Sequence, residues 1–446
     1  MSSVKVMKEI FFSSSRKKNC TNLPIPEDTG DIVVSGDIIT MIVLGTSLLV
    51  YDISQPRWPR RRRRSEWRLD FDFSILQLAL DSSQDLLAMV ETPRPVVTYE
   101  GPWNIYIKSL TTGGKATEAA GSCLTLPIGK VLDCHPSYGY TSQNRTVERF
   151  IIQVHDCYVG VMYGFVPAEL VIWNWKTGQT VSKYRHEEYR TFSFLPGNRV
   201  VIGANFRGFT PESYYRAVRL LVFQLDGGGF EYSSPPSGTT FLLPSIDGSA
   251  GADVISISNG HTTLGASSVI TDDSVIVVSV LTRNVELNIL RATHVIPVKA
   301  LISHPDSDNL VQWKDWGQKN THLWTSGLFG ERGAPEYHVS GCRIAFLDTF
   351  SNEENCWLVR VVDFHRRRVK RALQRRSEDV KQGAESHGQA VFDEATITTQ
   401  LPFTETKMRL PREIGRQSTI SVLVGGNSLV VVEGNRVDSK VHIYAL

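Results

Sequence analysis

Cysteine is scarce in this chain: six residues among 446, irregularly spaced and without a C-x-x-C pair. Such a pattern forms no disulfide framework, and it is typical of a reducing compartment. The most apolar stretch, residues 38–51, is interrupted by Thr, Gly and Ser and falls short of the roughly 20 residues of a membrane helix. The first residues include Lys5, Lys8 and Glu9, and they lack the apolar segment that a signal peptide requires. We therefore expect a cytoplasmic or nuclear protein with no membrane partner.

Catalytic and cofactor-binding motifs are missing as well. The sequence has no G-x-S-x-G nucleophile turn, no P-loop and no G-x-G-x-x-G; the glycines at 227–229 lead into a Ser/Pro loop instead of a helix. Cys134 beside His135, and His155 near Cys157, are too few ligands for a structural zinc site. We predict that the protein is not an enzyme and holds neither a metal nor a cofactor.

Charge of one sign does not dominate, because 48 Lys and Arg against 46 Asp and Glu give a net charge of +2. This balance provides no overall attraction to nucleic acid or to acidic membranes. With 41% hydrophobic and 21% charged residues, the composition is that of a globular protein.

Two local basic clusters stand out against this balance. One spans Arg60–Arg64, and the other spans His365–Arg371 and is followed by Arg375 and Arg376. Either could be a nuclear-import signal or a patch that contacts phosphates. The candidate residues of this basic patch are Arg61, Arg62, Arg63, Arg366, Arg367 and Arg368. We favour the alternative that both clusters are solvated surface segments, and we expect that nucleic acid is not the partner.

One phrase is abundant: a run of β-formers, often with an aromatic residue near its end, followed by Asp, Asn or Gly. The clearest copies are Leu48–Asp52, Trp103–Ile107, Leu170–Trp175, Leu220–Phe223, Trp357–Asp363 and Val441–Tyr444. A phrase that recurs every several dozen residues indicates a repeat protein, here one built of β-sheets. Long amphipathic helices are hard to find, and the best candidate is a charged segment at 369–380.

Many of these strands are apolar on both sides. One four-stranded sheet cannot bury both faces alone, so such sheets stack around an axis as the blades of a propeller. The expected third strands lie near Tyr51, Tyr106, Trp173, Phe223, Leu287, Val361 and Tyr444. We predict an all-β protein with a single closed β-propeller of about seven four-stranded blades at 31–446, after a flexible tail at 1–30. Loop insertions are expected toward the C-terminus, including a basic and polar one at about 365–400; a chain of β-sandwich domains is the structural alternative.

The repeated phrases resemble those of WD40-like propellers, with Tyr51-Asp52 and Trp173-Asn174 in place of the Trp-Asp dipeptide. More narrowly, they resemble the C-terminal propeller region of fungal F-box proteins. That resemblance implies a protein-interaction scaffold, the substrate-recognition propeller of an SCF-type ubiquitin ligase. The F-box itself is not evident, since Leu23–Glu27 only weakly resembles the Leu-Pro-x-Glu pattern with which an F-box opens. The SCF adaptor is therefore expected as a partner only if an F-box lies upstream.

Four aromatic residues between the fifth and sixth phrases are candidate partner contacts, because aromatic side chains on propeller loops often anchor proteins. They are Trp313, Trp316, Trp324 and Phe329. Loop packing is the alternative for them. The leading prediction is a non-catalytic scaffold that binds a protein or peptide. A propeller enzyme with a central-channel site, and a nucleic-acid-associated propeller that uses its Arg clusters, remain the alternatives.

Overall fold

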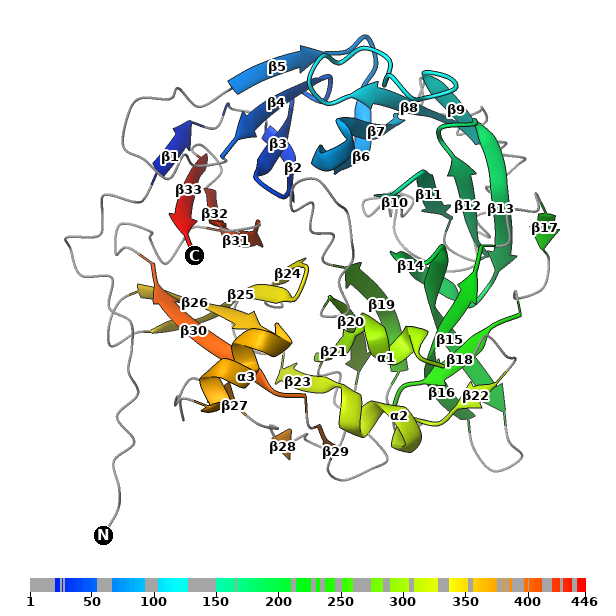
Figure 1. Ribbon diagram of the computed structural model, residues 1–446, viewed down its shortest axis with the longest axis vertical. Helices are drawn as coiled ribbons and strands as arrows, with labels where there is room; N and C mark the ends of the chain where they lie inside the picture. The colour runs from blue at the N-terminus through cyan, green and yellow to red at the C-terminus, as the bar shows by residue number, and fades with distance from the viewer. Residues whose placement is uncertain are drawn as a thin grey trace.

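The computed structural model describes residues 21–24, 26, 29–53, 66–92, 103–126, 150–164, 167–209, 214–225, 230–232, 237–244, 251–259, 274–283, 289–304, 309–327, 337–351, 356–374, 380–381, 385–386, 397–399, 401–410, 419–425, 428–434 and 439–446. The strands form seven sheets with a core of four strands each, arranged in a ring (Figure 1). The predicted all-β propeller of about seven four-stranded blades is thereby confirmed.

The first four blades follow the chain in order. Blade 1 is β2 (Thr29–Ser35), β3 (Ile38–Val43), β4 (Ser47–Asp52) and β5 (Glu66–Asp70). Blade 2 is β6 (Ile75–Asp81), β7 (Leu86–Glu91), β8 (Trp103–Ser109) and β9 (Cys123–Leu126). Blade 3 is β10 (Ile151–His155), β11 (Tyr158–Tyr163), β12 (Ala168–Asn174) and β13 (Gln179–His186). Blade 4 is β14 (Tyr189–Leu195), β15 (Arg199–Phe209), β16 (Tyr214–Gln224) and β18 (Thr239–Leu242).

The last three blades carry the insertions. Blade 5 is β19 (Gly251–Asn259), β20 (Val275–Arg283), β21 (Ile289–Pro297) and β23 (His322–Gly327), with helices α1 (Val298–Ile302) and α2 (Trp313–Asn320) before β23. Blade 6 is β24 (Tyr337–Ser340), β25 (Arg343–Ser351), β26 (Cys356–Asp363) and β30 (Phe403–Arg409), with helix α3 (Arg366–Gln374) before β30. Blade 7 is β31 (Thr419–Val424), β32 (Ser428–Gly434), β33 (Ser439–Ala445) and β1 (Thr21–Pro24).

Short additional strands extend the outer edges of three blades. They are β17 (Phe230–Tyr232) beside β13, β22 (Leu310–Val311) beside β18 and β27 (Val380–Lys381) beside β30, while β28 (Glu385–Ser386) pairs with β29 (Ile397–Thr398). A short 3-10 turn, η2 (Ser82–Gln84), joins β6 to β7. The insertions expected toward the C-terminus are thus present between the third and fourth strands of blades 5 and 6. The helix expected at 369–380 overlaps α3, and Val380, at the end of the expected segment, pairs with β30 as part of β27.

The ring is closed by the two ends of the described chain. Strand β1 pairs antiparallel with β33, Thr21 opposite Ile443 and Pro24 opposite Lys440, and supplies the outer strand of blade 7 (Figure 1). Residues 21–24 were expected in a flexible tail at 1–30, and this boundary is wrong, because the last blade takes its fourth strand from the first strand of the chain. The rest of the expected tail, residues 1–20, lies outside the described residues.

Third strands end in a repeated hydrogen bond. The residue that follows the strand is apolar and buried in six blades, and its N–H donates to a carbonyl in the first turn of the same blade. The pairs are Ile53 with Asp37, Leu110 with Asp85, Trp175 with Cys157, Leu225 with Asn198, Val298 with Ser274 and Phe364 with Cys342, at 2.7–3.0 Å. In blades 1, 3 and 4 this residue lies two positions after the last aromatic residue of the strand, which is Tyr51, Trp173 or Phe223. In blade 5, Leu287 lies outside the described residues, and the third strand begins at Ile289.

Polar side chains join the innermost strands of neighbouring blades. The first strand of a blade is an edge strand, so its backbone groups need partners from outside the blade. Three of these bonds run from Gln153 to the Phe192 carbonyl (3.0 Å), from the Ile257 N–H to the Thr191 hydroxyl (3.2 Å) and from the Val424 N–H to Nδ1 of His338 (3.1 Å). They link blades 3 to 4, 4 to 5 and 6 to 7.

Burial of His338 makes the stability of the ring depend on pH. Burial lowers the pKa of this imidazole from 6.5 to about 4. A base with a depressed pKa in the folded protein stabilises the fold above pH 6.5, and that contribution is lost as the pH falls toward 4. We expect a loss of roughly 3 kcal/mol in the free energy of unfolding over this interval.

The variant His338→Asn isolates this effect, because its side-chain oxygen still accepts from Val424 and does not titrate. Urea denaturation of both proteins at a series of pH values between neutrality and pH 4 measures the free energy of unfolding. This free energy should fall less in acid for the variant than for the wild type. Superimposable pH profiles would show that His338 is not responsible.

Candidate interaction surface

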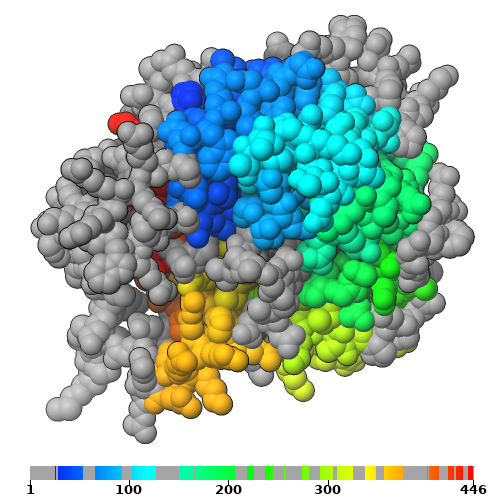
Figure 2. All heavy atoms as spheres, turned by 45° about the horizontal axis from the view of Figure 1, so that its top comes forward, coloured from blue at the N-terminus to red at the C-terminus, as the bar shows by residue number. Residues whose placement is uncertain are grey.

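Helix α3 carries a strongly basic surface on blade 6. Five of its nine residues are Arg or Lys, and it contains no Asp or Glu. Arg366, Arg367, Arg368, Lys370 and Arg371 are all exposed, whereas Val369 is buried against the blade. In the space-filling view, the orange segment that includes α3 projects at the lower edge of the described surface (Figure 2). The helix thus has one apolar side that packs and a wide cationic side that faces solvent.

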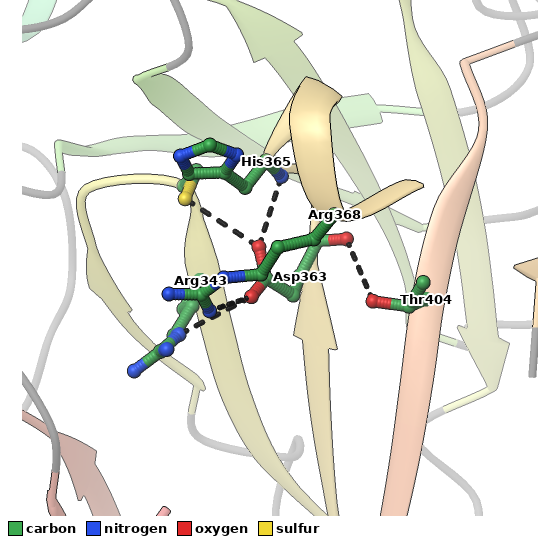
Figure 3. A network of polar contacts seen from close by, with 6 residues as sticks. Arg343, Asp363, His365, Arg368 and Thr404 are labelled. Atoms are coloured by element: carbon green, nitrogen blue, oxygen red, sulfur yellow. Dashed lines mark hydrogen bonds and ion pairs between the residues drawn. The ribbon is translucent and has the colours of Figure 1, made fainter. Parts of the chain in front are cut away.

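Asp363, the last residue of β26, attaches α3 to the blade (Figure 3). Its carboxylate accepts hydrogen bonds from the His365 N–H at 2.9 Å and from Nε of Arg343 at 3.3 Å, and it forms a close ion pair with Arg368. The Cys342 thiol donates to the same carboxylate at 3.5 Å. One buried charge therefore connects the first turn of the blade, the end of its third strand and the first turn of the helix.

Burial and charge act in opposite directions on the ionisation of this cluster. Burial by itself raises the pKa of the Asp363 carboxyl, but the His365 N–H and the guanidinium groups of Arg368 and Arg343 outweigh it, so the pKa lies below its ordinary value. Burial and the Asp363 charge together raise the pKa of the Cys342 thiol to about 12. Cys342 is therefore a neutral hydrogen-bond donor at physiological pH and not a reactive thiolate.

The two predicted basic clusters have different outcomes. Arg366, Arg367 and Arg368 lie on α3, and the structure confirms that they are exposed. Arg368 is committed to Asp363. Arg61, Arg62 and Arg63 lie outside the described residues, between β4 and β5.

Two of the four predicted aromatic contacts are buried. Trp313 and Trp316 are only 5% and 1% exposed, because α2 inserts both rings between blades 4 and 5. Nε1 of Trp316 donates to the Leu242 carbonyl at 3.1 Å, and its ring lies 5.1 Å from that of Phe241. These two side chains pack inside the protein between the blades. The expectation that they contact a partner is therefore wrong, and the alternative of loop packing holds.

The other two aromatic candidates lie elsewhere. Trp324 is partly buried on β23, where its ring packs between blades 5 and 6, with centroids 5.4 Å from Phe346 and 6.2 Å from Phe403. Phe329 lies outside the described residues. By contrast, Trp173 and Trp175 are buried and Trp357 is partly buried, as expected for aromatic residues at the ends of blade strands.

Asp363 and Leu373 were not among the predicted site residues, and Lys370 and Arg371 belonged only to the wider basic cluster. Val369, the one apolar residue within Arg366–Arg371, is the sequence signal that could have marked the packed side of the helix. The role of Asp363 had no such signal, because its partners Arg343 and Cys342 come from a turn some 20 residues earlier.

The part of the chain that the structure describes offers neither a metal cluster nor a membrane span. No group of three or more His, Cys, Asp or Glu side chains there is arranged to hold a metal ion. Within the same part of the chain, no helix has both the length and the apolar character required to cross a membrane.

The chain is similar to known proteins in structure and not in sequence. No protein-family model matches the chain, and no curated protein matches it by sequence. Among solved structures, it is similar to the β-propeller domain of Cps50 (Swd1) from Myceliophteria thermophila, with 8% identity, a TM-score of 0.41 and coverage of 96% of this chain and 99% of that one. It is also similar to Saccharomyces cerevisiae Sqt1, with 11% identity, a TM-score of 0.35 and coverage of 94% of this chain and 84% of that one. For the N-terminal domain of Nup159 the identity is 10%, the TM-score is 0.36, and the coverage is 96% of this chain and 94% of that one. Similarities this distant carry no argument about the activity or partners of this chain, so the assignment as a seven-bladed β-propeller rests on its own strand pairing.

Proposed function

We propose that the protein is a non-catalytic scaffold that binds another protein through the cationic side of α3. The observation that carries this proposal is the construction of blade 6: a buried carboxylate and a buried valine hold the helix in place, while its charged side chains remain exposed. A helix fixed in this way loses little conformational entropy when a partner binds, which favours recognition over chemistry.

The finer form of the proposal is that the propeller recognises substrates for an F-box-type ubiquitin ligase. The resemblance of phrases such as Leu170–Asn174 to the propellers of F-box proteins supports it. This form requires an SCF adaptor as a second partner, bound through a segment other than the blades.

Affinity purification of the tagged protein from its native cells, followed by cross-linking mass spectrometry, tests both the scaffold proposal and its ligase form. The scaffold proposal expects a recurrent protein partner with cross-links to Lys370, the lysine of α3. Co-purification of an SCF adaptor would support the ligase form. A protein that remains monomeric and without a partner under native conditions would contradict the scaffold proposal.

A further inference from the structure

We infer that the cationic side of α3 binds an acidic segment of a partner protein that also carries an apolar residue. This inference rests on the proposed scaffold function and specifies the chemistry of its partner. The surface, named here the α3 face, consists of Arg366, Arg367, Lys370, Arg371 and Leu373.

The first argument is that this charge pattern is unfavourable for the helix alone. Arg366 lies four residues before Lys370, and Arg367 four residues before Arg371, so two pairs of like charges are neighbours on the helix surface. Asp363, just before the helix, supplies the negative charge that the N-terminal end of a helix favours, and it pairs with Arg368. The two like-charge pairs have no such compensation from Asp363, whereas an anionic partner would offset their repulsion.

The second argument concerns three of these cations, Arg367, Lys370 and Arg371. Among the residues that the structure describes, no carboxylate forms an ion pair with Arg367, Lys370 or Arg371. Two acidic groups of the same blade already form ion pairs: Asp363 with Arg343 and Arg368, and Glu405 with Arg360 at 3.4 Å. These charges can therefore pair with carboxylates supplied from outside.

The third argument distinguishes a protein from other polyanions. Leu373 is 39% exposed, one of four large apolar side chains that are exposed among the described residues, and it lies beside Lys370 on the helix. A nucleic-acid backbone offers nothing to cover an apolar side chain, and one leucine is too little apolar surface for stable membrane attachment. Carboxylates together with one apolar side chain match the α3 face in both charge and polarity.

The test measures binding of a fluorescent synthetic peptide of Glu and Asp with two Leu residues to the full-length protein, by fluorescence anisotropy. We expect salt-sensitive binding that weakens roughly tenfold or more in the triple variant Arg367→Glu, Lys370→Glu, Arg371→Glu. Leu373→Ser, and a peptide in which Ser replaces Leu, should each weaken binding by about threefold. A matched control is Arg185→Glu, Lys314→Glu, Lys319→Glu, which changes the net charge equally at exposed positions outside α3 and should bind like the wild type.

Several outcomes would overturn the inference: equal loss of binding in the control variant, no effect of Leu373→Ser, or tighter binding of a single-stranded oligonucleotide or of anionic phosphatidylserine vesicles than of the peptide. Circular dichroism and urea denaturation of each variant show whether it is folded.

The two proposals fail separately. If the α3 triple variant captures the same partners as the wild type in affinity purification, the α3 assignment fails and the scaffold function stands. If the wild type captures no partner, the scaffold function itself fails.

Discussion

Replacing Asp363 with Ala is expected to destabilise the protein by about 3 kcal/mol and to release α3 from blade 6. The substitution leaves Arg343, whose side chain is 14% exposed, without the buried carboxylate that compensates its charge. It also removes the acceptor for the His365 N–H at the start of the helix. Urea denaturation measures the loss, and hydrogen exchange should show faster exchange of α3 amides than of amides in the other blades.

The graded variant Asp363→Asn separates charge from hydrogen bonding, because it still accepts from His365 but carries no charge; we expect it to lose about half as much stability. Asp70→Ala is the matched control. Asp70 also pairs with an arginine, Arg68 at 2.8 Å, but its side chain is 69% exposed, so a much smaller change is expected.

The effect of Asp363 should also depend on pH. Because the carboxyl has a lowered pKa in the folded protein, its contribution is present above its ordinary pKa of 3.8 and is lost as the pH falls through the folded value. The difference between the wild type and Asp363→Ala should therefore shrink in strong acid. A difference that does not change with pH, or a variant as stable as the wild type, would refute the role assigned to this carboxylate.

Replacing Gly160 with Val is expected to cost about 3 kcal/mol or more, because two blades meet at this residue. A Cβ at Gly160 would lie 2.7 Å from Cε2 of Phe192 and 3.0 Å from Cζ of Phe194. Both rings are buried, at 0% and 1% exposure, and they pack edge to face with centroids 5.7 Å apart. Neither ring has free space to move into, so blades 3 and 4 would have to separate.

Gly160→Ala should already destabilise the protein, by about 1–3 kcal/mol, and Gly30→Ala is its control. Gly30 is also a strand glycine, but a Cβ there would make an ordinary contact of 3.6 Å with Ile42. We expect Gly30→Ala to be neutral or slightly stabilising, because it reduces the entropy of the unfolded chain. Thermal or urea unfolding of the two Ala variants would decide the matter: equal stabilities would mean that the blade interface is not tightly packed at Gly160.

The apolar pattern of the sequence predicted the architecture. Strands such as Leu170–Trp175 and Ser428–Val432 are apolar on both sides, and sheets covered on both faces bury them, so the local pattern favoured a ring of blades over a chain of β-sandwich domains. Third strands were located wherever an aromatic residue marked their end, as at Tyr51 or Trp173. The fifth was misplaced by a few residues because β21 has no aromatic residue.

Features that depend on long-range contacts became apparent only in the tertiary structure. Pairing of Thr21 with Ile443 made the beginning of the chain part of the last blade, and no local signal near residue 21 indicates a partner so distant in sequence. Trp313 and Trp316 have the sequence signature of an exposed loop, and their burial depends on the space between two blades. The cationic cluster at 366–371 was visible in the sequence, but its presentation depends on Asp363, Arg343 and Cys342, which only the folded blade brings together. Hydrophobic periodicity is a local property and encodes the strands, whereas burial and charge pairing depend on residues that are far apart in the chain and meet only after the ring has closed.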